Sequence, residues 1–193
     1  MDINILKGRI AEAFVEGILR RAGYQVALIG RESRVQHLLK VGRDQFLPDF
    51  LVWKPVDDPD SSWPPCRLAG IEVKYRRDIG AYLRRQFTED SARVAQEWPE
   101  LYFVLVTDQP EEGRSCFQAV RPHPAPHGQP LPTMDLHEVA ALDIHKRNVE
   151  EHERLATQIL PLLGAASRAA GDLPRKPAAK VAPHPPPLLR LAR

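Results

Sequence analysis

Cysteine is nearly absent from this 193-residue chain, in which Cys66 and Cys116 are the only two. This pair forms neither the CxxC spacing of a zinc site nor the framework of a disulfide-rich secreted domain. The sequence also has no apolar run of the ~20 residues that a membrane-spanning helix needs. Its first residues contain no signal-peptide core. We therefore expect a soluble cytoplasmic protein with reduced cysteines and no contact with a membrane.

A strong excess of one charge is missing too, since 27 Lys and Arg stand against 25 Asp and Glu. The balance nevertheless changes along the chain. Residues 1–85 hold 15 basic and 11 acidic side chains, residues 86–164 hold 6 and 13, and residues 165–193 hold 6 and 1. A basic first part permits a face for a polyanion such as nucleic acid. The acidic second part or the basic tail suits a partner protein.

Hydrophobic periodicity divides the chain into helices and strands. Apolar residues at helical spacing predict a helix over 4–22, which Gly23 ends. A second helix is expected over about 79–98, with a break near Thr88, and helical material from about 135 to 164. The predicted strands cover residues 24–30, 46–55, 68–77, 101–108 and 114–120. The continuous apolar run at 101–108 predicts a central strand buried on both faces.

This order predicts an α/β fold, with a mixed sheet flanked by helices. Little helix separates the first three strands, so we expect an antiparallel meander, and no Gly-rich phosphate loop supports a Rossmann unit. We expect three parts: a core over 1–120, a loop and helical extension over 121–164, and a disordered tail rich in Pro, Ala and basic residues over 165–193.

The segment LAGIEVKYRR, residues 68–77, places charged residues inside a strand. Strand side chains alternate between the faces of a sheet, so Glu72 and Lys74 share one face, while Ile71 and Val73 share the other. A solvated ion pair worth no more than ~1 kcal/mol is one interpretation. The other is a catalytic site.

Asp49 and Glu12 favour the catalytic interpretation. Neighbouring strands lie about 5 Å apart, so Asp49 and Glu72 can reach one divalent cation. Mg²⁺ prefers oxygen ligands, usually one or two carboxylates. The predicted metal ligands are Asp49, Glu72, the Val73 carbonyl and Glu12. The predicted catalytic residues are Asp49, Glu72, Lys74 and Glu12, and Lys74 would orient the attacking water or stabilise the charge of the transition state.

The chain resembles the PD-(D/E)XK nuclease superfamily over residues 5–107, through PDF at 48–50, EVK at 72–74 and the helix KGRIAEAFVEGILRRAGYQV before them. The closest branch is the archaeal Holliday-junction resolvase-like one. The matching positions are Glu12, Asp49, Glu72 and Lys74. The resemblance implies a restriction-endonuclease-like core of order α-β-β-β-α-β and a Mg²⁺-dependent nuclease, with Mn²⁺ as a substitute. It also implies a homodimer, since dimers are common in this family.

Basic side chains near this segment suit a phosphate-binding rim, since Lys and Arg dominate the affinity for nucleic acid. The residues selected are Lys7, Arg34, Arg76 and Arg77. We expect an endonuclease that hydrolyses phosphodiester bonds of nucleic acid, most readily DNA. The alternatives are a catalytically inactive module of the same fold that binds nucleic acid or a partner protein, and an unrelated α/β protein in which the acids lie far apart.

Overall fold

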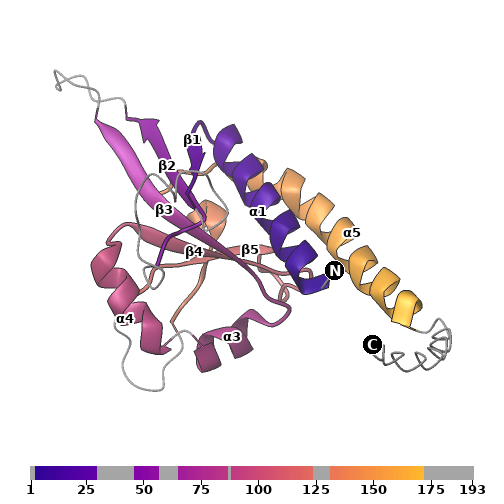
Figure 1. The fold of residues 1–193 in the computed structure, drawn as a ribbon. Helices are drawn as coiled ribbons and strands as arrows, with labels where there is room; N and C mark the ends of the chain where they lie inside the picture. Colours follow the sequence, from indigo (N-terminus) through magenta and orange to yellow (C-terminus); the bar gives the residue numbers. More distant parts are fainter. Residues whose placement is uncertain (1–2, 30–45, 57–64, 87, 124–130, 172–193) are drawn as a thin grey trace, which may run out of the picture.

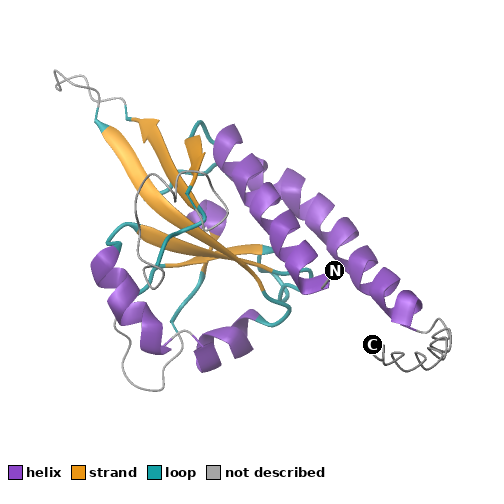
Figure 2. Ribbon diagram, viewed as in Figure 1, coloured by secondary structure: helices purple, strands orange, loops and turns teal. Residues whose placement is uncertain are grey.

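The computed structural model describes residues 3–29, 46–56, 65–86, 88–123 and 131–171. These residues form an α/β structure, in which a six-stranded mixed sheet with open edges is flanked by helices (Figure 1 and Figure 2). The strands lie side by side in the order of the sequence. The expected α/β class is therefore confirmed.

The first three strands form the predicted antiparallel meander. Strand β1 (Gln25–Leu28) pairs with β2 (Phe50–Pro55), and β2 pairs with β3 (Cys66–Tyr75). Strand β3 is the longest and extends well beyond the start of β2 (Figure 1). Part of β3 therefore has no paired neighbour on the side of β2.

The second half of the sheet begins with a parallel pair. Strand β4 (Leu101–Val106) runs parallel to β3, and the helices α3 (Ile79–Gln86) and α4 (Thr88–Glu97) connect the two strands. The boundary between these helices falls at residue 87, close to the break predicted near Thr88. Strands β5 (Phe117–Val120) and β6 (Met134–Asp135) then add in antiparallel order.

Two apolar clusters fix the helices to opposite faces of the sheet. One cluster packs α1 (Ile3–Arg21) and α5 (Lys146–Gly171) onto a face that includes Ile71 and Val104. The other packs α3 and α4 onto the face that includes Leu105. All six residues of β4 are buried, because its side chains enter the two clusters alternately. This confirms the prediction that 101–108 holds a central strand buried on both faces.

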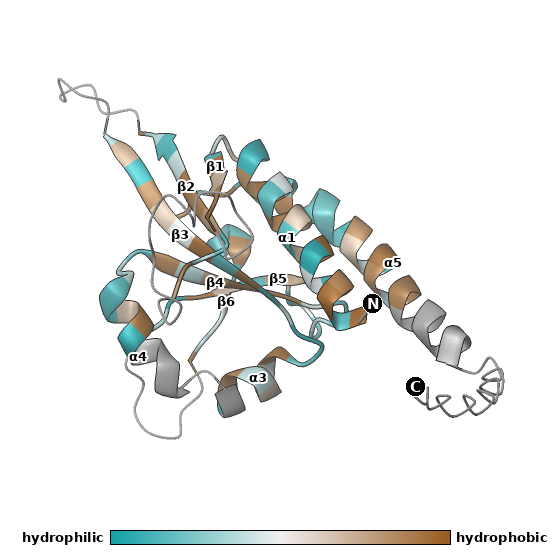
Figure 3. Cartoon of the chain, in the orientation of Figure 1, coloured by the Kyte–Doolittle hydropathy of each residue, from teal (hydrophilic) through white to brown (hydrophobic). Residues whose placement is uncertain are grey.

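Helices α1 and α5 lie side by side on their face of the sheet (Figure 1). Polar and apolar residues alternate along both, as amphipathic helices require (Figure 3). Helix α1 ends as predicted: Gly23 adopts φ 87°, and its N–H donates to the Arg20 carbonyl at 3.1 Å. None of the described helices combines the length and apolarity needed to cross a bilayer.

The expected helix from residue 135 was wrong at its start. Residues 134–135 form β6, a 3-10 turn covers Leu136–Glu138, and α5 begins only at Lys146. The physical reason is a polar anchor: the Asp135 carboxylate accepts hydrogen bonds from Arg114 (2.9 Å) and the Ser115 N–H (3.1 Å), which holds this segment against β5.

Residues beyond 120 share the core of the preceding part. Leu136 and Leu142 are buried in the same apolar cluster as α1 and the sheet, so the extension and the expected 1–120 core pack as one body. Helix α5 continues to Gly171, into the segment expected to begin the tail at residue 165. The remainder of the tail lies outside the described residues.

The contact between α1 and α5 depends on a glycine. A Cβ atom at Gly17 would lie 2.6 Å from Nε2 of His152, whose ring also meets Phe14 edge-on. We expect Gly17→Leu to lower the free energy of unfolding by about 1–3 kcal/mol, because the added side chain overpacks this contact. Urea denaturation measures the change. The variant His152→Ala should remove part of this cost in the double variant, and strictly additive losses would contradict the contact.

Candidate functional site

The site forms where β2 begins and where β3 continues with β4 as its paired strand. Phe50 at the start of β2 pairs with Ile71, so the same register places Asp49 opposite Glu72. The Asp49 side chain is half-buried. Its Oδ2 accepts a hydrogen bond from the Val73 N–H at 2.8 Å, in place of the backbone acceptor that a neighbouring strand would supply. The main chain of Asp49 is held in turn, because its carbonyl accepts the Ile29 N–H at 3.1 Å.

Glu72 and Lys74 point to the face of the sheet covered by α3 and α4. Glu72 is paired with Phe103 and Lys74 with Leu105, and both partners belong to the apolar cluster of that face. Glu72 is 5% exposed, and its Oε1 accepts a hydrogen bond from the Lys74 ammonium. We call this group, with Asp49, the Asp49–Glu72–Lys74 cluster.

One atom of this cluster lacks a partner. Oε2 of Glu72 is buried, and no hydrogen bond satisfies it in the part of the chain that the structure describes. A buried carboxylate oxygen without a partner costs about 1–3 kcal/mol or more. Such an atom needs an explanation, and a bound water, an ion or a catalytic role are the usual ones.

The Val73 carbonyl points to the side of β3 on which Asp49 lies. On both sides of this stretch the even-numbered residues bond to β4: the Gly70 N–H donates to Glu100 (2.9 Å) and the Arg76 N–H to Val106 (2.8 Å). Backbone groups of successive residues point to opposite sides of a strand. The N–H and carbonyl of Val73 therefore face the side where β2 is absent, beside Asp49. The role of Val73 as a backbone ligand stays a prediction.

The two carboxyl groups are near enough to affect each other. The pKa of Glu72 is raised to about 7 in all: burial and the charge of Asp49 raise it, while the charge and hydrogen bond of Lys74 and the backbone N–H of Asp49 lower it. Burial also raises the pKa of Asp49, while the Val73 N–H and the charges of Lys74 and Arg9 lower it. Glu72 is consequently about half protonated at neutral pH.

Lys74 remains a cation in this environment. Burial alone would lower the pKa of Lys74, but the charges of Glu72 and Asp49 and the hydrogen bond to Glu72 raise it above its ordinary value. Its side chain is 34% exposed, in contrast to 6% for Glu72. The cluster therefore has a buried acidic end and an ammonium that reaches solvent.

Glu12 does not join the other acids. Among the described residues, ligand atoms of Glu12, Asp49 and Glu72 do not all lie within 4.8 Å of one another. Glu12 instead pairs with Arg9 at 2.9 Å on α1. Because the charge of Arg9 acts on Asp49, the Arg9–Glu12 pair stands beside the site. The structure thus brings three of the four predicted catalytic residues together and leaves the fourth at the margin.

Lys7 is buried in a separate polar network. Its ammonium donates to the Tyr75 hydroxyl and to the Asp108 carboxylate, both at 2.8 Å, and the side chains of Lys7 and Asp108 are 10% and 6% exposed. The Tyr75 hydroxyl also donates to Asp108 at 2.8 Å. This network fastens α1 to the ends of β3 and β4, an arrangement that favours a role in packing for Lys7 over contact with phosphate.

The other predicted phosphate contacts differ in their surroundings. The Arg76 guanidinium lies over the Tyr82 ring, 4.2 Å from its centroid, while Arg77 is exposed and donates to Gln109 at 3.1 Å. Arg34 lies outside the described residues. Tyr82 was not among the site residues predicted from the sequence.

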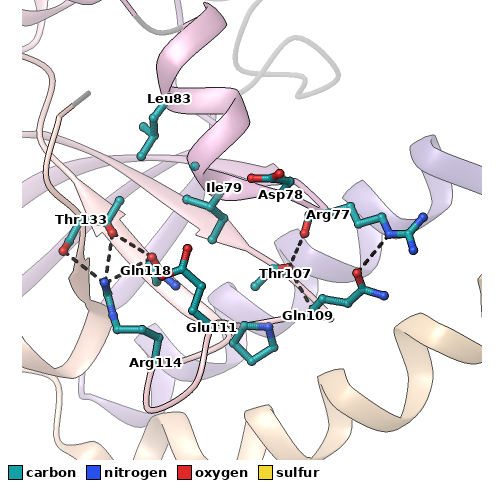
Figure 4. Close-up of a pocket in the computed structure, with 12 residues that line it drawn as sticks. Arg77, Asp78, Ile79, Leu83, Thr107, Gln109, Glu111, Arg114, Gln118 and Thr133 are labelled. Atoms are coloured by element: carbon teal, nitrogen blue, oxygen red, sulfur yellow. Dashed lines mark hydrogen bonds between the residues drawn. The ribbon is translucent and has the colours of Figure 1, made fainter. Parts of the chain in front are cut away.

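A cavity of about 540 Å³ lies beside α3 (Figure 4). Ile79 and Leu83 form its apolar wall, and Arg114 lies across it. The Arg114 guanidinium is occupied by Asp135 and by two neighbours of the cavity, Thr133 at 3.0 Å and Gln118 at 3.2 Å. The lining includes no member of the Asp49–Glu72–Lys74 cluster, so the cavity is a separate feature.

A second group of potential metal ligands was not predicted. Ligand atoms of Asp135, His137 and Glu138 lie within 4.8 Å of one another. The Asp135 carboxylate already accepts hydrogen bonds from Arg114 and Ser115. This group therefore anchors β6 and provides no free acidic pair.

Comparisons with known proteins identify no relative: no family model, no curated protein and no solved structure matches this chain. The argument for function consequently depends on the geometry of the Asp49–Glu72–Lys74 cluster.

The mutual influence of the cluster's charges can be measured directly. Lys74→Met removes the nearest positive charge, so the pKa of Glu72 should rise above about 7, by about one pH unit or more. Asp49→Asn removes a negative charge and should lower it. Carboxyl ¹³C NMR titration in the absence of divalent cations provides the measurement. Unchanged values in both variants would show that the three groups do not interact.

Proposed function

We propose that this protein is a Mg²⁺-dependent nuclease that hydrolyses phosphodiester bonds, with DNA as the favoured substrate. The observation that carries the proposal is the unpartnered, buried Oε2 of Glu72 beside Asp49 and Lys74. Two adjacent carboxylates with a free oxygen suit a divalent cation, and a neighbouring ammonium suits phosphate chemistry.

The fold supports this proposal through its topology. A helix, three antiparallel strands, two short helices and a fourth strand parallel to the third follow one another here. This is the order that the resemblance to PD-(D/E)XK nucleases implies, with Glu72 and Lys74 on the third strand and Asp49 just before the second. We accordingly assign the chain to the restriction-endonuclease-like fold as part of the proposal.

The residues present suit Mg²⁺ or Mn²⁺. Asp49 and Glu72 would supply carboxylate oxygens and Val73 its carbonyl, an all-oxygen set that hard cations prefer. Such a cation, when bound, polarises a phosphodiester and lowers the pKa of water. The cation would also contact Oε2 of Glu72, which has no hydrogen-bond partner among the described residues. Its positive charge would favour loss of the proton from the Glu72 carboxyl, whose pKa is raised by burial.

The chain's own groups would position and stabilise the reacting atoms. Lys74 keeps its proton and reaches solvent, so its ammonium would orient a water molecule or stabilise the negative charge that grows on the phosphoryl oxygens. When the carboxylates bind a cation, the Lys74 ammonium would no longer be held by its hydrogen bond to Glu72. Glu12 would act indirectly, by holding Arg9 next to Asp49.

Metal binding should depend on the cluster and on pH. We expect Mn²⁺ to raise the melting temperature of the wild-type protein and to have little effect on Asp49→Asn or Glu72→Gln. Because the cation competes with a proton on Glu72, whose pKa is about 7, the affinity should be about tenfold higher at pH 8 than at pH 6. Titration calorimetry measures the affinity. Binding that Glu138→Gln removes, and Glu72→Gln does not, would locate the metal elsewhere.

Nuclease activity should depend on the same residues. With Mg²⁺ or Mn²⁺, purified protein should cleave plasmid, linear or branched DNA, and Glu72→Gln or Lys74→Met should lower kcat by about 100-fold or more. The matched controls Glu138→Gln and Lys146→Met change exposed side chains away from the cluster. They should retain activity.

Two other results would contradict the proposed function. Cleavage that survives both Glu72→Gln and Lys74→Met would contradict the proposed catalytic site. A folded protein that binds DNA or a partner protein, and cleaves none of these substrates, would instead be an inactive module of the same fold.

A further inference from the structure

Arg76 continues the row of charged residues on β3. Its N–H donates to the Val106 carbonyl at 2.8 Å, so the ladder between β3 and β4 extends one residue past the end of the strand. Because side chains two apart share a face, Glu72, Lys74 and Arg76 lie along one face, with a step of about 7 Å. This row runs from the buried acid to the partly exposed side chain of Arg76.

The Arg76 guanidinium is held in place by two contacts. Nη1 donates to the Tyr75 carbonyl at 2.8 Å, and the guanidinium carbon lies 4.2 Å from the centroid of the Tyr82 ring. An arginine has five N–H donors, so the bond to Tyr75 leaves others for a ligand. A stacked guanidinium loses little further freedom when it binds phosphate.

Arg76, like Arg77, differs from several other basic residues in having no salt bridge to a described carboxylate. In the described part of the chain, Lys7 is paired with Asp108, Arg9 with Glu12 and Arg114 with Asp135. No salt bridge to a described carboxylate neutralises Arg76. Its positive charge therefore remains available for an anion next to Lys74.

We propose that Arg76, held by Tyr82, forms a second phosphate subsite for the phosphate adjacent to the one that Lys74 contacts. The Cα atoms of the two residues lie about 7 Å apart along the strand, which is similar to the separation of neighbouring phosphates in a nucleotide chain. This inference rests on the proposed function and sharpens its substrate class. The substrate is a polynucleotide, engaged through at least two consecutive phosphates, and an isolated phosphodiester uses only half of the site.

The first experiment measures binding, so it does not depend on cleavage. Fluorescence anisotropy with a labelled DNA oligonucleotide in Ca²⁺ gives Kd for the wild-type protein and for Arg76→Gln, Tyr82→Leu and Tyr82→Phe. We expect Arg76→Gln to weaken binding about tenfold and to reduce the dependence of log Kd on log salt by about one unit. Tyr82→Leu should weaken it less, and Tyr82→Phe, which keeps the ring, should weaken it least.

The matched control is Arg154→Gln, which removes the same charge from an exposed position on α5, across the sheet from the row. Equal affinities of Arg76→Gln and Arg154→Gln would overturn the subsite. Equal effects of Tyr82→Leu and Tyr82→Phe would overturn the role of the stacked ring. Circular dichroism and the melting temperature of each variant exclude loss of folding as the cause.

The second experiment separates the subsite from the reaction. The kcat/KM for the oligonucleotide, divided by that for bis(p-nitrophenyl) phosphate, should fall about tenfold in Arg76→Gln, because only the oligonucleotide has a flanking phosphate. An unchanged ratio would overturn the inference. If neither substrate is cleaved, the proposed nuclease fails, whereas a loss of oligonucleotide affinity in Arg76→Gln would still support the phosphate subsite.

Discussion

The difference in length between β2 and β3 is the constraint from which the site follows. Beyond Ile71, β3 has a paired strand on one side only, and the Val73 N–H would be left without a backbone acceptor there. Asp49 supplies that acceptor with its carboxylate. This hydrogen bond satisfies the Val73 N–H at the edge of the sheet and places the Asp49 carboxylate opposite Glu72. The same side chain therefore contributes both to the sheet and to the candidate site.

The cluster formed in this way is unfavourable without a ligand. Glu72 is buried, carries an unpartnered oxygen and has a pKa of about 7. Since that pKa is raised above the value of an unfolded chain, the contribution of Glu72 to stability is greatest in acid and is lost as the pH rises through about 7. A bound cation would reverse this cost. A cost of this kind is common at functional sites, where stability is sacrificed for chemistry.

The remainder of the molecule holds this strand from both faces. On one face, Lys7 ties α1 to Tyr75 and Asp108, and the apolar residues of α1 and α5 cover Ile71 and Val73. On the other face, α3 brings Tyr82 beneath Arg76. A side chain on β3 therefore has a fixed direction, which is the condition for a preorganised site.

The sequence by itself determined much of this arrangement. Alternation in LAGIEVKYRR put Glu72 and Lys74 on one face, continuous apolarity marked β4 as central, and Gly23 ended α1; these are local rules with periods of two and 3.6 residues. Tertiary structure decided the remainder. The capping of Val73 by Asp49, the pairing of Lys7 with Asp108, the position of Glu12 outside the cluster and the strand at Asp135 all depend on contacts between residues distant in sequence. Such contacts leave no periodic pattern in the sequence, because the partners of buried and charged side chains are brought together only when the chain folds.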